Sequence, residues 1–150
     1  MSRYIKIFAV TIVSIILITH FLIDLSVVEG PSMSPTIKDG EIIAVLKVGS
    51  VKRGDVVTLS LEEENHLIKR IVAEPGDSLK IENGELYING VVNNDYKSPS
   101  RYADWNGLEV DLDEDEYYVM GDNRDNSLDS RTYGVMTRDE ITGKVVFHFY

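Results

Sequence analysis

Residues 79 to 88 read Leu-Lys-Ile-Glu-Asn-Gly-Glu-Leu-Tyr-Ile, and this stretch decides the fold class. Apolar and polar side chains alternate on both sides of Asn83-Gly84, which is the pattern of two strands that each bury one face. A type I′ turn requires positive φ at both of its central residues, and Asn-Gly meets that requirement well. The stretch therefore predicts a β-hairpin, and Asn89-Gly90 repeats the turn signal directly after it.

Short runs of the same kind occur on both sides of the hairpin, separated by Gly, Pro and Asn. The expected strands are 41–48, 56–61, 66–73, 78–81, 85–88, 116–120 and 144–149. Nothing after residue 28 sustains helical periodicity for long, so we expect an all-β domain. Residues 93 to 116 lack a period and are expected to form a long loop or an insertion, with a solvated acidic end at 109–116.

The N-terminal segment has a different character. Residues 7 to 23 are almost continuously apolar. At 1.5 Å per residue, the segment from about Ile5 to Val28 can cross a hydrocarbon core of roughly 30 Å. Arg3 and Lys6 flank its start, so the positive-inside rule predicts a cytoplasmic N-terminus. We therefore expect a cytoplasmic N-terminus and single transmembrane anchor in residues 1–28, and an extracellular domain in residues 29–150.

The same segment can also be interpreted as a secretory signal peptide that is cleaved off, because such peptides share the basic start and the apolar core. That core is usually only about 7 to 15 residues long and precedes an Ala-x-Ala site, which this chain does not have here. Cleavage after Gly30 would place Pro31 directly after the bond, and a proline nitrogen fits most protease sites poorly. We therefore favour a retained anchor.

The composition excludes several classes of protein. The chain has a net charge of −10, and residues 29–150 carry 13 basic and 24 acidic side chains, a formal charge of −11. This charge argues against nucleic acid or anionic lipid as the main partner of the exterior domain. The lack of cysteine excludes a disulfide scaffold, a Cys nucleophile and thiolate metal sites. The sequence shows no metal-ligand cluster, phosphate loop or nucleotide motif, so we expect no cofactor and no metal.

A second informative stretch is residues 121 to 131, Gly-Asp-Asn-Arg-Asp-Asn-Ser-Leu-Asp-Ser-Arg. Leu128 is its only bulky apolar residue. The stretch has the composition of an internally paired ion network, in which bidentate Arg–carboxylate contacts fix the geometry. Composition alone also fits a solvated polar turn. The charged residues concerned are Asp122, Arg124, Asp125, Asp129 and Arg131.

Three further motifs complete a recognisable set. They are Ser-Met-x-Pro-Thr at 32–36, Arg-Gly-Asp-Val-Val at 53–57, and Lys-Arg-Ile at 69–71 shortly before Pro-Gly-Asp. Together with 121–131, and in this order, they resemble the type I signal peptidases, membrane-bound Ser/Lys proteases that remove signal peptides from secretory preproteins. The resemblance spans about residues 1 to 147. It implies a mostly antiparallel, two-sheet catalytic domain after one transmembrane helix, and at this length a compact enzyme of the Gram-positive type.

The resemblance implies that Ser32 is the nucleophile and that Lys69 takes its proton and later activates water. A serine hydroxyl needs such a general base to attack a peptide bond. Lysine can serve only when it is neutral, so its pKa must fall from about 10.4 to about 7 or 8. Desolvation by apolar neighbours can cause that fall. Taken alone, Lys69-Arg70 would instead be interpreted as the exposed face of a strand.

The resemblance also assigns supporting roles. Ser127 and Asp129 match residues that orient the lysine, and the backbone N–H of Ser32 is expected to form part of the oxyanion hole. Some relatives add a hydroxyl two residues before the nucleophile, where this chain has Gly30. The family cleaves after small residues at −1 and −3, which implies an extended peptide bound beside strands. The family positions that line the substrate pockets correspond to Val28, Met33, Ile37 and Ile68.

Other interpretations remain open at this point. His66 is the rival base, although in a regular strand it would point to the face opposite Lys69. A catalytically silent relative that assists the assembly of surface proteins is a non-enzyme alternative, but such relatives typically lose the nucleophile or the base. A soluble Ser/Lys autoprotease of the LexA-like repressor type shares the dyad, but the apolar segment argues against it. The expected partners are therefore secretory preproteins and the lipid bilayer, and the expected location is the cell membrane.

Overall fold

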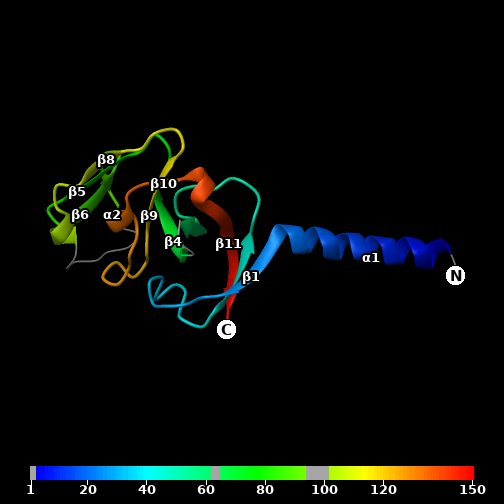
Figure 1. Cartoon of the computed structure of the whole chain (residues 1–150). Coiled ribbons are helices and arrows are strands. Elements are labelled where there is room, and N and C mark those ends of the chain that lie inside the picture. Colours follow the sequence, from blue (N-terminus) through cyan, green and yellow to red (C-terminus); the bar gives the residue numbers. More distant parts are fainter. Residues whose placement is uncertain (1–2, 62–64, 94–101) are drawn as a thin grey trace.

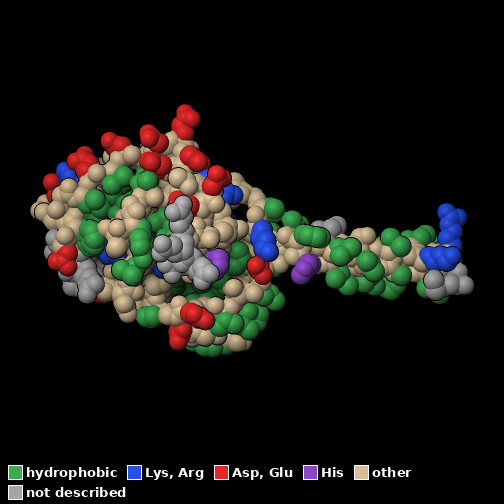
Figure 2. All heavy atoms as spheres, in the orientation of Figure 1, with side chains coloured by type: hydrophobic (Ala, Val, Ile, Leu, Met, Phe, Trp, Pro, Cys, Tyr) green, Lys and Arg blue, Asp and Glu red, His purple; other side chains and the backbone are tan. Residues whose placement is uncertain are grey.

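The computed structural model describes residues 3–61, 65–93 and 102–150. A helix, α1 (Arg3–Leu22), projects from a body of strands (Figure 1). It is long and apolar enough to cross a membrane, and none of it is buried against the rest of the described chain. Hydrophobic side chains cover the helix in Figure 2, basic ones lie at its far end, and acidic ones are spread over the body.

Two sheets make up the body, and every strand pair that the structure describes is antiparallel. The two-sheet, mostly antiparallel prediction is therefore confirmed. The larger sheet has seven strands in the order β1-β2-β11-β3-β4-β9-β10. They are β1 (Ile23–Val27), β2 (Ile42–Leu46), β11 (Ile141–Phe149), β3 (Val56–Leu61), β4 (Asn65–Ala73), β9 (Glu116–Met120) and β10 (Met136–Thr137).

The smaller sheet has the order β7-β6-β5-β8 and contains the predicted hairpin. Its strands are β5 (Ser78–Glu82), β6 (Glu85–Ile88), β7 (Val91–Val92) and β8 (Glu109–Asp111). Asn83 and Gly84 have φ of 53° and 76°, as a type I′ turn requires, and Asn89-Gly90 makes the same turn between β6 and β7. Three short helices complete the described structure: η1 (Tyr102–Trp105), α2 (Ser130–Tyr133) and η2 (Arg138–Glu140).

Two predictions from the sequence are corrected by the strand pairing. The apolar segment expected to run from Ile5 to Val28 is helical only to Leu22, and the next five residues form β1, which pairs with β2. The acidic run that begins at Glu109 is not only a solvated loop, because Glu109–Asp111 pairs with β5 and turns Val110 toward the core. The remainder of the expected 93–116 loop includes residues 94–101, which lie outside the described residues.

The hydrophobic core consists of three clusters, and one of them lies beneath the residues expected to be catalytic. That cluster is formed by residues that are at most 5% exposed, and Ile68 packs against it. Its members come from the loop between β1 and β2 and from β2 itself. The loop is therefore held by its own apolar side chains. The buried members are Val28, Met33, Ile37, Ile43 and Val45.

Candidate active site

Ser32 lies in the loop that joins β1 to β2, and this loop is closed at its base. The N–H of Val28 donates to the carbonyl of Glu41 (2.8 Å), and the N–H of Gly40 donates to the carbonyl of Val28 (2.9 Å). Within the loop, Met33 is fully buried, whereas Ser32 beside it is half-buried. Because the neighbouring methionine is locked in the core, the serine hydroxyl has a fixed position at the surface of the site.

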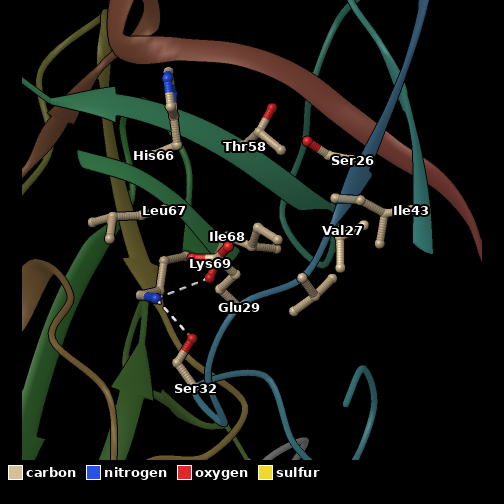
Figure 3. A pocket seen from close by; sticks show the side chains of 11 residues that line it. Ser26, Val27, Glu29, Ser32, Ile43, Thr58, His66, Leu67, Ile68 and Lys69 are labelled. Atoms are coloured by element: carbon tan, nitrogen blue, oxygen red, sulfur yellow. Dashed lines mark hydrogen bonds between the residues drawn. The ribbon is translucent and has the colours of Figure 1, made fainter. Parts of the chain in front are cut away.

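Lys69 lies on β4 opposite Val57 of β3, and its side chain is only 3% exposed. Its Nζ atom is 3.0 Å from the Oγ atom of Ser32 and donates a second hydrogen bond to the carbonyl of Ile68 at 2.9 Å (Figure 3). The contact between Lys69 and Ser32 joins two residues that are 37 positions apart in the sequence. The structure thus brings together the two residues that the sequence proposes as nucleophile and base.

Burial lowers the pKa of Lys69 from its usual value, because the ammonium form loses the hydration that it has in water. The carboxylate of Asp129 opposes this effect, since a nearby negative charge favours the protonated lysine. Desolvation is the larger influence, so the net direction is downward. The pKa of Lys69 is therefore shifted in the direction that makes a lysine usable as a general base.

Asp129 is completely buried and is the acceptor around which the 121–131 stretch is organised. Arg131 donates two hydrogen bonds to its carboxylate (2.9 and 2.8 Å), and the N–H of Gly121 donates a third (3.0 Å). Burial alone would raise the pKa of Asp129, but the hydrogen bonds and positive charge of Arg131 outweigh burial and bring the pKa below its usual value. Asp129 is therefore a fixed negative charge near Lys69.

Ser127 lies at the edge of the same network. Its Oγ atom is buried, and no described group forms a well-aligned hydrogen bond with it. The hydroxyl still lies close enough to Asp129 to favour the charged carboxylate. The amine of Lys69 donates to the Ser32 hydroxyl and to the carbonyl of Ile68, not to Ser127. A direct hydrogen bond from Ser127 to the lysine, as its expected role implies, is thus not made in this structure.

The 121–131 stretch also touches the nucleophile loop directly. The N–H of Asn123 donates to the carbonyl of Ser32 (2.9 Å), and its side-chain amide donates to the carbonyl of Pro31 (3.1 Å). Gly121 lies so close that a Cβ atom there would be 2.5 Å from the Ser32 carbonyl oxygen. Glycine is needed at this position because the two backbones approach each other closely. The position of Ser32 therefore depends on both loops.

The predicted ion network is only partly internal to the stretch. Asp129 pairs with Arg131 as predicted, but Asp122 pairs with Arg70 from the Lys-Arg motif on β4, through two hydrogen bonds of 2.8 and 2.6 Å. Arg124 donates to the backbone carbonyl of Gly121. The bond between Asp122 and Arg70 ties the stretch to the residue beside Lys69, which explains why both motifs are needed to build one site.

A cavity of about 310 Å³ begins at the dyad and runs between β1 and β4. Of the four residues expected to line substrate pockets, Val28 and Ile68 line this cavity. Met33 and Ile37 do not, because they are 0% and 1% exposed and lie in the core beneath it. Seven further residues line the cavity, and of these only His66 is a candidate from the sequence, as the rival base. They are Ser26, Val27, Glu29, Ile43, Thr58, His66 and Leu67, which come from β1 to β4 and the loop after β1 (Figure 3).

His66 lies at the end of this cavity away from Ser32 (Figure 3), and the contact to the serine hydroxyl comes from Lys69. The interpretation of His66 as the base is therefore not supported. Among the residues that the structure describes, no group of three or more His, Asp or Glu could hold a metal ion.

Comparison with known proteins identifies the family. The sequence profile described as "Signal peptidase, peptidase S26" matches residues 1–150. This chain belongs to the signal peptidase family. Signal peptidase I P of Bacillus subtilis subsp. natto is 37% identical over 97% of this chain and 86% of its own length, and signal peptidase I of Bacillus licheniformis is 38% identical over 99% and 88%.

Signal peptidases of lower identity also match much of the chain. Signal peptidase IB of Staphylococcus aureus (strain N315) is 31% identical over 95% of this chain and 85% of that protein. The crystal structure of a signal peptidase I from Enterococcus faecalis V583 aligns with a TM-score of 0.52 and 26% identity, covering 65% of this chain and 97% of that one. The resemblance that the four motifs indicate is thus confirmed, together with the fold.

Proposed function

We propose that this protein is a membrane-anchored serine endopeptidase that removes signal peptides from secreted preproteins, with Ser32 as nucleophile and Lys69 as general base. The observation that carries the proposal is the 3.0 Å contact between the Ser32 hydroxyl and the buried amine of Lys69. Family membership supports the reaction, and the lowered pKa of the Lys69 amine supports its role as a base.

The reaction follows from this geometry. Neutral Lys69 accepts the proton of the Ser32 hydroxyl while the oxygen attacks the scissile carbonyl. The resulting ammonium gives that proton to the leaving amine, so an acyl-enzyme and a free N-terminus are formed. Neutral Lys69 then takes a proton from water, whose oxygen attacks the ester, and the proton returns to Ser32. Lysine has the same protonation state at the end as at the start.

The oxyanion of each tetrahedral intermediate needs hydrogen-bond donors. The N–H of Ser32 is available, because no described group accepts from it. The N–H of Gly30 is not, since it donates to the carboxylate of Asp39 at 2.7 Å, and glycine has no side chain to replace it. The Ser32 N–H is therefore the one donor that we assign, and loss of one such donor typically costs about 3 kcal/mol of transition-state stabilisation.

The cavity fits an extended peptide on the acyl side of the bond. In the described chain, β1 pairs only with β2, and residues 65–69 of β4 pair only with β3, so each strand offers a free edge. Both of these edges border the cavity. A peptide laid between them points alternate side chains to the same side, which accounts for selection at −1 and −3 together. Val28 and Ile68 lie where the side chain at −1 would be enclosed.

The anchor and the site are close in the sequence. We propose that α1 spans the membrane with Arg3 on the cytoplasmic side and the β body outside. Since α1 is followed directly by β1, which borders the cavity, the site would lie near the outer membrane surface. A preprotein whose own apolar segment is still in the membrane would present its cleavage region at that height.

The proposal is tested with the detergent-solubilised full chain and a preprotein that carries an Ala-x-Ala site. The wild type should cut after the final Ala, as read by mass spectrometry, and Ser32→Ala or Lys69→Ala should lower the rate on the order of 10⁴-fold or more. Ser34→Ala in the same loop and Lys80→Ala on an exposed strand are matched controls that should stay active. A wild type that cleaves none of several preproteins would place a non-enzymatic assembly role first.

A further inference from the structure

A second cavity, of about 460 Å³, opens on the other side of the dyad. It shares only Ser32, Leu67 and Lys69 with the first cavity, so the two meet where the dyad lies. Its other walls come from the nucleophile loop, from the 121–131 stretch and from the end of α2. These are Pro31, Asp125, Asn126, Ser127, Leu128 and Tyr133.

The chemistry proposed above decides which part of a substrate belongs in each cavity. The bond that Ser32 attacks must lie at the junction, because the reacting carbon has to be within reach of its oxygen. The free edges of β1 and β4 and the apolar residues Val28 and Ile68 place the acyl side in the first cavity. A substrate chain that continues through the junction must then enter the second cavity with its leaving-group side.

The second cavity has a composition that suits apolar side chains. Leu128 and Tyr133 are large, yet they are 60% and 46% exposed and belong to none of the three core clusters. The backbone of Tyr133 is tied to the buried network of the site, since its N–H donates to the carbonyl of Asp129 (2.9 Å). Asp125 adds an exposed carboxylate to the rim.

We propose that this second cavity is the subsite for the first residues of the mature chain, the leaving side of the cleaved bond. Leu128 and Tyr133 favour an apolar or aromatic side chain at +1 or +2, and the carboxylate of Asp125 disfavours an acidic one there. The inference rests on the proposed function, because it assumes that the dyad cleaves a peptide between the two cavities. It explains why the otherwise polar 121–131 stretch contains one leucine.

The test uses the full chain in detergent and peptides that are identical from −7 to −1 but carry Leu, Tyr, Ala or Asp at +1 and +2. The wild type should cleave the Leu and Tyr peptides about 5- to 10-fold more efficiently, in kcat/KM, than the Ala peptide, and the Asp peptide least efficiently. Leu128→Asn and Tyr133→Ser should each reduce this preference to about twofold or less. Val91→Asn, which removes another exposed apolar residue, from the small sheet, should leave the preference unchanged.

A second peptide series, varied only at −3, separates a leaving-side subsite from a general effect on the site. The Leu128 and Tyr133 variants should keep the wild-type preference at −3. The inference is overturned if the wild type cleaves all four leaving-side peptides equally, or if the variants change selection at −3 instead. A wild type that cleaves no peptide of either series would overturn the proposed function itself, which is a different result.

Discussion

Gly121→Ala should show how far activity depends on the position of the nucleophile, independently of the stability of the fold. Gly121 is buried, and a Cβ atom at this position would lie 2.5 Å from the carbonyl oxygen of Ser32 and equally close to the side chain of Ser127, whose Cβ atom is 2.6 Å away. A comfortable carbon–oxygen contact is about 3.3 Å or more, so the two backbones must separate by about 0.8 Å. Because Asn123 ties its own loop to the Ser32 carbonyl, the displacement passes directly to the nucleophile loop.

The size of the effect follows from that displacement. A misplacement of about 1 Å in a reacting group can cost on the order of 100-fold in rate, so kcat/KM of Gly121→Ala should fall by about that factor. Overpacking of a closely packed region typically lowers the free energy of unfolding by about 1 to 3 kcal/mol. The protein should therefore still fold, and its thermal midpoint should fall by a few degrees.

Gly143→Ala is the matched control. A Cβ atom there would press on the side chain of Val45 and lie 3.0 Å from the Leu46 carbonyl oxygen, and neither residue lines the two cavities that meet at the dyad. Both variants should lose comparable stability, but only Gly121→Ala should lose most of its activity in a peptide-cleavage assay. If Gly121→Ala keeps kcat/KM within threefold of the wild type while it melts like Gly143→Ala, the argument from loop proximity is refuted.

The other predictions concern charged groups. Lys69→Arg should be inactive in the same assay, because a guanidinium stays protonated and cannot accept the serine proton. Lys69→Met should also be inactive but more resistant to urea near neutral pH, because it removes the cost of burying an ammonium group. In the wild type this cost to folding is full below the lowered pKa of Lys69 and fades as pH rises toward 10.5. The stabilities of the variant and the wild type should therefore converge in alkali. Arg131→Met should cost about 3 to 5 kcal/mol of unfolding free energy, since it leaves the carboxylate of Asp129 buried without its partner. The pKa of Asp129 is lower in the folded protein than in the unfolded chain, so its ionised carboxylate stabilises the fold at pH above the unfolded pKa. That stabilisation is lost as pH falls through the folded pKa. The Arg131→Met variant should therefore unfold at a higher pH than the wild type on acid titration.

Local signals in the sequence were sufficient for much of the fold. The Asn83-Gly84 and Asn89-Gly90 turns were predictable because their backbone requirements are met by the two residues themselves. β1 was not predictable, because Ile23–Val27 continues an apolar run and becomes a strand only through pairing with β2, about 20 residues later. β8 was not predictable for a similar reason, since its acidic residues form a strand only through pairing with β5, which is distant in the sequence.

The same contrast between local signals and long-range packing holds for the active site. Ser32 and Lys69 could be named from motifs, but their 3.0 Å contact depends on β4 and the β1–β2 loop being packed over one core cluster. Met33 and Ile37 have the right chemistry for a pocket and lie below it instead. The walls of the cavity come from strands that are far apart in sequence, so Thr58 and His66 carry no local sign of their position.

The pH dependence of kcat/KM, measured on the detergent-solubilised full chain with one peptide substrate, tests most directly whether neutral Lys69 is the base for Ser32. Only the neutral amine is active, so the rate should rise with pH through an apparent pKa below the ordinary value for lysine and then level off. A rate that is flat between pH 6 and 9, or that rises only near the ordinary pKa of lysine, would contradict the account.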